Sequence, residues 1–219
     1  MASAALDYKK EFWDLYHPKA APRLIDVPAI LFLAVDGKGN PNEEGGEYSR
    51  AMELLYALSY SIKMSKMGPE KPEGYFEYVI PPLEGLWWLE GDRPFAFSEK
   101  DKFCWTSMIR QPEFVTPGML DSAKAAVRKK KPELDVSRAK FFTYREGLCV
   151  QVMHLGPYDG EPATMARLQE FLRANGYRDA VSDRLPDGTV LRHHEIYLGD
   201  PRKTEPSRLK TVLRHPVKK

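Results

Sequence analysis

The segment Ile30-Leu31-Phe32-Leu33-Ala34-Val35-Asp36-Gly37 is the main indication of a repeated fold, because it has a counterpart in the second half of the chain. Residues 29–35 form an apolar run of strand length that ends in a glycine-containing loop, and an uninterrupted helical pattern covers 47–67. The stretch 150–156 ends in a similar loop, and a helical pattern over 162–174 follows it. Each half therefore predicts a strand, a loop, a long helix and returning strands.

Two such units commonly pair their sheets about a pseudo-twofold axis, and a small-molecule cleft forms where the halves meet. The expected class is α+β, with an antiparallel sheet. We expect one domain over 1–219, with an N-terminal helical extension at 1–28, a first half at 29–135 and a second half at 136–219. The remaining predicted elements are strands at 75–80, 82–89, 103–109, 141–145, 148–155 and 190–198, and helical segments at 7–16, 118–131 and 206–213.

The composition fits one or two ordinary soluble domains. The chain has 219 residues, of which 42% are hydrophobic, and its 33 Lys and Arg nearly cancel its 31 Asp and Glu. A net charge of +2 creates no field that would hold the chain on nucleic acid or an anionic membrane. The basic end, 208–219, has no interleaved aromatic residue, so it is expected to be a solvated tail and not a nucleic-acid arm.

The cysteines and the opening residues predict a reducing cytoplasm. Cys104 and Cys149 are each flanked by apolar residues in predicted strands, which favours structural free thiols. The opening Met-Ala-Ser-Ala-Ala lacks the basic and apolar regions of a signal peptide, and no run approaches the roughly 20 apolar residues of a membrane span.

Familiar catalytic motifs are missing. His193-His194-Glu195 suggests a metal ligand set, but the zinc-protease pattern needs a second histidine four residues after the first. The chain also lacks Gly-x-Ser-x-Gly, a phosphate-binding loop and Gly-x-Gly-x-x-Gly. We therefore expect neither a metal site nor a cofactor.

Glu195 is the candidate that remains. In a strand, His193, Glu195 and Tyr197 share one face, so Glu195 and Tyr197 face the cleft if Ile196 and Leu198 face the helices. A carboxylate among aromatic rings could take a proton from water or attract a cation. The alternative, equally supported by the pattern, is an edge-strand glutamate that faces solvent or pairs with Arg192 or Arg202.

Three of the four tryptophans lie between residues 87 and 105. Neighbouring strands could build a stacking wall from Trp87, Trp88 and Trp105. Trp87 and Trp88 are adjacent, so only one of them can reach the cleft, and core packing is the default role of any single tryptophan.

The chain resembles the GyrI-like small-molecule-binding family, and more narrowly its standalone members. The resemblance covers nearly the whole chain and rests on segments at 10–18, 36–42, 55–60, 82–88, 111–115, 154–158 and 194–202, which include Pro-Leu-Glu-Gly-Leu-Trp-Trp, His-Leu-Gly-Pro-Tyr and His-Glu-Ile-Tyr-Leu-Gly-Asp-Pro-Arg. That resemblance implies the same tandem fold with a ligand cleft.

The resemblance also implies a function. Some standalone members hydrolyse the strained cyclopropane of DNA-alkylating natural products such as yatakemycin, without a cofactor. Carried over, it implies Glu195 and Tyr197 as catalytic residues and an aromatic binding site drawn from Trp87, Trp88, Trp105, Met108 and Phe114.

Two alternatives are a protein that only binds aromatic or cationic molecules, as a sequestering protein or sensor, and a gyrase-directed protein-interaction role. The expected partner is a small ligand. The sequence sets no oligomeric state.

Overall fold

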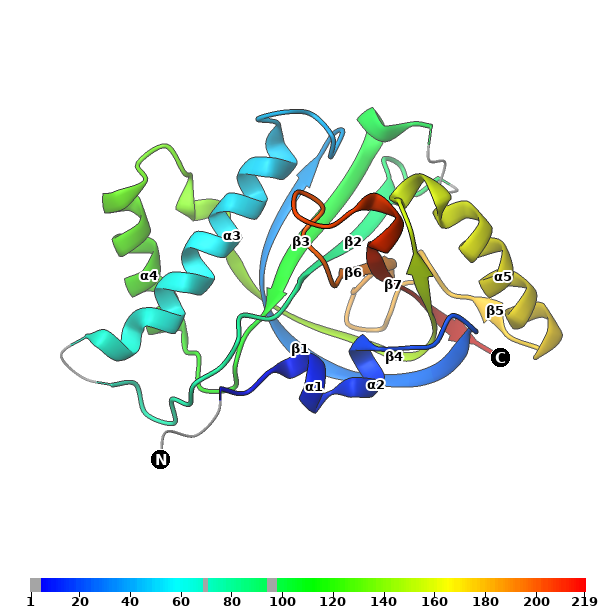
Figure 1. The fold of residues 1–219 in the computed structure, drawn as a ribbon, viewed down its shortest axis with the longest axis horizontal. Coiled ribbons are helices and arrows are strands. Elements are labelled where there is room, and N and C mark those ends of the chain that lie inside the picture. Colours follow the sequence, from blue (N-terminus) through cyan, green and yellow to red (C-terminus); the bar gives the residue numbers. More distant parts are fainter. Residues whose placement is uncertain (1–4, 69–70, 94–97) are drawn as a thin grey trace.

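The computed structural model describes residues 5–68, 71–93 and 98–219, and it confirms the tandem α+β arrangement. The first half contains β1 (Arg23–Lys38), α3 (Glu47–Lys63), β2 (Leu83–Leu89) and β3 (Phe103–Arg110). The second half repeats this order with β4 (Lys140–Leu155), α5 (Glu161–Ala174), β6 (His193–Tyr197) and β7 (Lys210–Lys218). Figure 1 shows α3 at the left and α5 at the right of the strands in that view.

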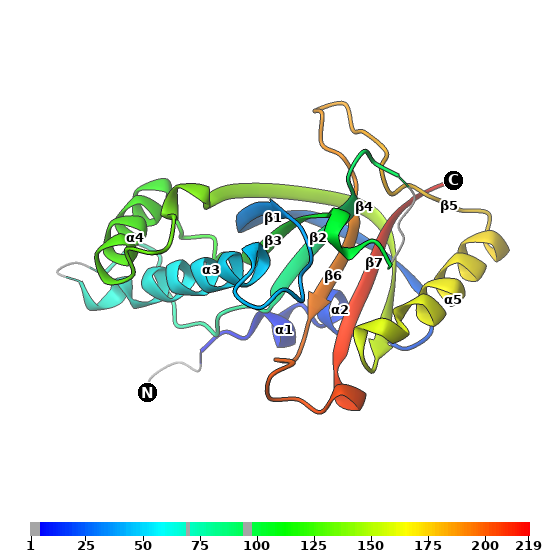
Figure 2. The same ribbon diagram turned by 90° about the horizontal axis from the view of Figure 1, so that it is seen from above.

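The strands form a closed antiparallel sheet. Their order is β4-β1-β3-β2-β6-β7-β5, and a further pairing of β4 with β7 closes the ring, while the short β5 (Arg178–Asp179) pairs only with β7. The halves join at two seams, β1 with β4 and β2 with β6, so equivalent strands of the two halves lie side by side (Figure 2). Closure leaves β6 between β2 and β7.

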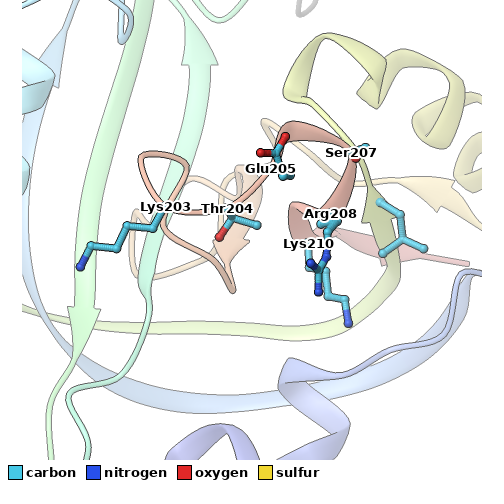
Figure 3. Close-up of a pocket in the computed structure, with 7 residues that line it drawn as sticks. Lys203, Thr204, Glu205, Ser207, Arg208 and Lys210 are labelled. Carbon is cyan, nitrogen blue, oxygen red and sulfur yellow. The ribbon is translucent and has the colours of Figure 1, made fainter.

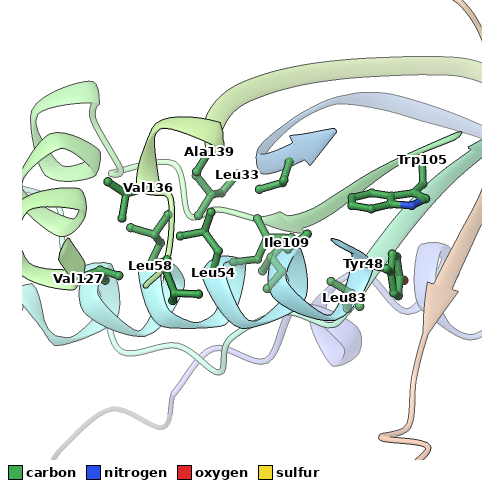
Figure 4. Packing of buried hydrophobic residues seen from close by; sticks show 14 of the residues in the cluster. Leu33, Tyr48, Leu54, Leu58, Leu83, Trp105, Ile109, Val127, Val136 and Ala139 are labelled. Carbon is green, nitrogen blue, oxygen red and sulfur yellow. The ribbon is translucent and has the colours of Figure 1, made fainter. Parts of the chain in front are cut away.

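The two faces of the sheet have different coverings. On one face, here called the helix face, α3 and α4 (Pro117–Lys130) cover a cluster that contains Leu33, Leu58 and Trp105 (Figure 4), and α5 covers Val150 and Leu213. On the opposite face lie the short helices α1 (Tyr8–Glu11) and α2 (Trp13–Tyr16). Within the described ranges, short 3-10 helices lie at Met64–Met67, Lys100–Lys102, Val136–Arg138, Tyr158–Gly160 and Pro206–Arg208.

The helical turn predicted at 206–213 is confirmed only at Pro206–Arg208, and the predicted solvated tail is wrong. Residues 210–218 form strand β7, and its Arg214 is only 1% exposed. The strand is buried along nearly its whole length on both faces, so it lacks the polar alternation that marks a half-buried strand. Arg214, His215 and Lys218 are held by partners from other parts of the chain, so the net charge of the segment is no guide to its exposure.

Two further element predictions need correction. The strands expected at 141–145 and 148–155 are one continuous strand, β4, in which Gly147 adopts a positive φ of 69° that glycine tolerates without strain. The strand expected at 75–80 is reduced to a single bridge between Leu6 and Tyr78, and its aromatic side chains pack around Phe114.

Among the described residues, no helix is long and apolar enough to cross a membrane. Both cysteines are free thiols. Residues 1–4, on which part of the localisation prediction depends, lie outside the described residues.

Candidate functional site

Glu195 lies in the middle of the closed sheet, opposite Gly85 of β2 and Leu213 of β7, and is 7% exposed. The edge-strand alternative is therefore wrong. Neither proposed arginine partner pairs with Glu195: Arg192 pairs with Asp92, and Arg202 pairs with its neighbour Asp200.

The predicted alternation of β6 is confirmed, but the covering of its faces is reversed. His193, Glu195 and Tyr197 lie on the helix face, whereas Ile196 packs into the core of the opposite face. Because α3 and α5 lie on the same face as Glu195, side chains of these helices contribute to the site together with those of the strands.

Tyr197 and Trp87 fix one oxygen of Glu195. The Tyr197 hydroxyl donates to Glu195 Oε2 at 2.7 Å, and Trp87 Nε1–H donates to the Tyr197 oxygen at 2.9 Å. Gly85 makes this packing feasible, since a Cβ there would lie 2.7 Å from Trp87 Nε1. Burial and the charge of Glu195 raise the pKa of Tyr197 well above its usual value, so the hydroxyl keeps its proton.

The other oxygen of Glu195 begins a row of polar contacts through the sheet. Glu195 Oε1 lies 2.9 Å from His193 Nε2, and His193 Nδ1 lies 2.6 Å from His215 Nε2. His215 Nδ1 in turn lies 2.6 Å from Asp179 Oδ2, which also accepts from Gln169. Burial lowers the pKa of His215 despite the nearby Asp179, which favours a neutral ring.

Glu161, the first residue of α5, adds a second carboxyl group that the sequence prediction missed. It is 2% exposed, and its Oε1 has no hydrogen-bond partner. Burial and then the charge of Glu195 raise the pKa of Glu161 to about 10, so it is a neutral acid at pH 7. Ligand atoms of Glu161, His193 and Glu195 all lie within 4.8 Å of one another, and these three residues could hold a metal ion.

Sequence spacing contained part of this signal. His193 and Glu195 are two residues apart in a strand, which places them on one face as a pair of ligands. The zinc-protease motif has helical spacing, so it does not detect two ligands that are two residues apart in a strand. Glu161 has no such sequence signal, because its approach to β6 depends on how α5 packs on the sheet.

Aromatic rings from several elements cluster near Glu195. Tyr48 of α3 lies 5.2 Å from Trp87 and 5.1 Å from Trp105 between ring centroids, the latter edge-on. Tyr158 lies edge-on to Tyr197 at 5.8 Å. Neither Tyr48 nor Tyr158 is among the predicted site residues, although both flank the ones that are.

The structure brings some of the predicted binding residues together and separates others. Trp87 contacts the Glu195 cluster, whereas Trp88 points to the other face, where Arg192 lies over its ring at 4.4 Å. Trp105 is fully buried behind Tyr48.

Met108 and Phe114 lie apart from Glu195. Met108 is buried in the core of the opposite face, because its pleat position in β3 is out of phase with that of Trp105. Phe114 packs among Tyr75, Phe76 and Tyr78. Neither position supports a cleft shared with Glu195.

The two cavities described for the chain lie elsewhere. One, of about 560 Å³, lies where the loop between β6 and β7 meets the end of β4 (Figure 3), and it is lined by Leu155, Lys203, Thr204, Glu205, Ser207, Arg208 and Lys210. The other, of about 270 Å³, lies beside Val27 and Arg145. Around Glu195 the side chains pack against one another, so a ligand that reaches this carboxylate must displace some of them.

The chain thus combines a closed tandem barrel with a buried carboxylate among aromatic rings. The chain belongs to the GyrI-like small-molecule-binding domain family, whose model matches residues 20–218. No curated protein matches the chain.

Solved structures include close relatives. An uncharacterised conserved protein from Listeria innocua is 48% identical, with a TM-score of 0.88 over 97% of this chain and 100% of that one. A protein described as a hydrolase from Listeria innocua is 46% identical, with a TM-score of 0.84 over 97% of this chain and 100% of that one. The EcmrR C-terminal domain, at 16% identity and a TM-score of 0.52 over 90% of this chain and 97% of that one, shares the fold alone.

Proposed function

We propose that the protein binds flat aromatic small molecules at Glu195 and hydrolyses the cyclopropane ring of cyclopropanoid DNA-alkylating compounds of the yatakemycin type. The observation that carries the proposal is a carboxylate fixed by Tyr197 and enclosed by Trp87, Tyr48 and Tyr158. The hydrolase description of relatives that are 46–47% identical to this chain favours a hydrolytic reaction.

The proposed reaction adds one water molecule to the substrate. The water oxygen bonds to the unsubstituted cyclopropane carbon as the carbon–carbon bond to the ring junction breaks. The electron pair of that bond passes through the conjugated ring to the carbonyl oxygen, which becomes a phenol on taking up a proton. Glu195 accepts the proton that the water loses, and release of ring strain and formation of an aromatic ring drive the step.

Each residue has a distinct part in this scheme. Trp87 and Tyr48 supply ring faces or edges for stacking, and electron-rich rings favour the positive character that develops at the attacked carbon. Tyr197 orients Glu195 through its 2.7 Å hydrogen bond. Trp105 supports Tyr48 from behind. The partly exposed rings of Tyr158 and Tyr197 are the groups that would move to admit a ligand.

The test is incubation of the purified chain with yatakemycin or a duocarmycin, with the water-added product followed by mass spectrometry. We expect catalytic turnover, reduced by about 10²- to 10⁴-fold in Glu195→Gln. Glu170→Gln, an exposed glutamate on α5, is the matched control and should leave turnover unchanged.

The second candidate function is binding without turnover, which the family's small-molecule-binding description favours. Tight binding with product at the uncatalysed rate would support it and overturn the hydrolase proposal for these substrates. Quenching of tryptophan fluorescence by the ligand, weakened in Trp87→Phe, would report binding in either case.

A further inference from the structure

Glu161, His193 and Glu195 bring two carboxyl groups and one imidazole to a single buried point between α5 and β6. Their ligand atoms lie within 4.8 Å of one another, and each side chain is at least nine-tenths buried. The Oε1 atom of Glu161 has no hydrogen-bond partner. A buried carboxyl oxygen without a partner costs free energy unless a ligand satisfies it.

A row of contacts runs behind the three residues, from Asp179 to Glu195. Three contacts join Asp179, His215, His193 and Glu195, at 2.6, 2.6 and 2.9 Å. The row holds His193 and Glu195 in place beside Glu161.

The neighbouring hydrogen bonds do not reach Glu161. The Tyr197 oxygen accepts from Trp87, and the Tyr197 proton goes to Glu195 Oε2. Glu161 Oε1 is left without a partner, and a metal ion at this point would supply one.

The groups behind the three residues are those that commonly support metal ligands. A ligating histidine usually uses its second ring nitrogen in a hydrogen bond that fixes its tautomer and orientation. His193 does so through His215, which Asp179 holds in turn, and Gln169 holds Asp179. Glu195 is oriented in the same manner by Tyr197.

We propose that Glu161, His193 and Glu195 bind one divalent transition-metal ion, for which Zn²⁺ fits best. One imidazole and two carboxylates suit Zn²⁺ better than Mg²⁺ or Ca²⁺, which prefer sites made only of oxygen. Three protein ligands leave a coordination position for water, as in catalytic zinc sites. The inference stands apart from the proposed hydrolysis, because metal binding is measured without any substrate.

The experiment uses the full chain, stripped with EDTA, desalted and titrated with Zn²⁺ by isothermal calorimetry, with bound zinc counted after gel filtration. We expect one zinc per chain and an affinity at least about tenfold lower in Glu161→Gln and His193→Gln. Glu170→Gln on the same helix should bind as the wild type does. An excess of Mg²⁺ should not displace the zinc.

Two readouts keep the result independent of variant folding. Co²⁺ added to the wild-type chain should give the visible absorption of a nitrogen- and oxygen-ligated site, and circular dichroism should show that both variants are folded. Zinc that does not remain bound through gel filtration would overturn the proposal. So would equal binding by the wild type and by folded Glu161→Gln and His193→Gln. Turnover of a cyclopropanoid, or its absence, bears on neither outcome.

Discussion

Two neighbouring residues of β6, His194 and Glu195, serve polar clusters of opposite character on the two faces of the sheet. On the opposite face, His194 lies 2.9 Å from Glu146 and 3.0 Å from Glu84, and Arg214 lies 3.1 Å from Glu146. Two cations there balance two carboxylates. On the helix face, Glu195 and Glu161 lie close together with no arginine or lysine paired to either among the described residues.

The two clusters differ in how their buried charges are balanced. Burial opposes ionisation of Glu146, but His194 and Arg214 outweigh it and lower its pKa to about 2. The same pairing, against burial, raises the pKa of His194 to about 9. The cluster of the opposite face is thus a set of matched charges that ties β4, β6 and β7 together. In the helix-face cluster, no arginine or lysine of the described residues pairs with the two carboxyl groups, and burial raises the pKa of Glu161. Buried carboxyl groups with such perturbed pKa values are typical of functional sites.

Removing one charge from the balanced cluster of the opposite face should have the largest effect on the free energy of unfolding. Arg214→Met leaves Glu146 with His194 as its remaining cationic partner and removes the bonds of Arg214 to Gln151 and to the Leu15 carbonyl. We expect a loss of about 3–5 kcal/mol in the free energy of unfolding, measured by urea denaturation. Arg208→Met, at an exposed position, should change it by less than about 0.5 kcal/mol. Equal small effects of the two substitutions would mean that the buried charges are not coupled.

The pH dependence of stability tests the same cluster without losing an arginine. A histidine whose pKa is raised on folding stabilises the protein fully below its unfolded value of 6.5, and that contribution is lost as the pH rises through about 9. The shift corresponds to roughly 3 kcal/mol. Urea denaturation between pH 6 and pH 10 should show this decline, and His194→Gln should make it shallower by the His194 contribution. A wild-type curve that is already flat over this range would show that His194 is not held in its charged form.

Much of the fold could be predicted because both copies of the repeat have clear periodic patterns of apolar residues. Residues 29–35 and 150–155 show their strands directly, and the helices after them have clear stripes. β7 could not be predicted in the same way, because Arg214 and His215 are polar yet buried, and only their partners in β4, β5 and β6 make that feasible. Local patterns do not contain partners that lie about 20 to 200 residues away.

The candidate site, too, could be predicted only where its residues share one element. The strand period places Glu195 and Tyr197 together, and that part of the prediction needs no tertiary contact. Glu161 and Tyr48 come from helices, and their approach to Glu195 depends on how α3 and α5 pack on the sheet. The family resemblance implies Met108 as a site residue, but the pleat of β3 turns it to the other face.

Neutralising the second carboxyl of the helix face should increase stability. In metal-free protein, the unfolded chain releases the Glu161 proton near pH 4.5, whereas the folded chain keeps it up to about pH 10. Stability therefore falls as the pH rises through this window. Glu161→Gln removes the penalty, and we expect a gain of about 1–3 kcal/mol at pH 8 in urea denaturation with EDTA present. Glu170→Gln should give no gain, and a destabilised Glu161→Gln would show that the Glu161 carboxyl is satisfied in the folded chain.

The smallest expected effect comes from a matched pair of hydroxyl deletions, one on each face. Tyr197→Phe removes the 2.7 Å bond to Glu195 and leaves the Trp87 indole N–H without its acceptor, whereas Tyr16→Phe removes a 3.3 Å bond to Glu84. Because Tyr197→Phe leaves a buried donor unpaired, we expect it to cost about 1–2 kcal/mol of stability, and Tyr16→Phe about 1 kcal/mol or less. Activity should separate the pair more sharply: Tyr197→Phe should lower turnover of a cyclopropanoid because Glu195 loses its orientation, while Tyr16→Phe should leave it unchanged. Equal loss of turnover in both variants would mean that the two faces act as one unit, and the division between a structural and a functional cluster would fail.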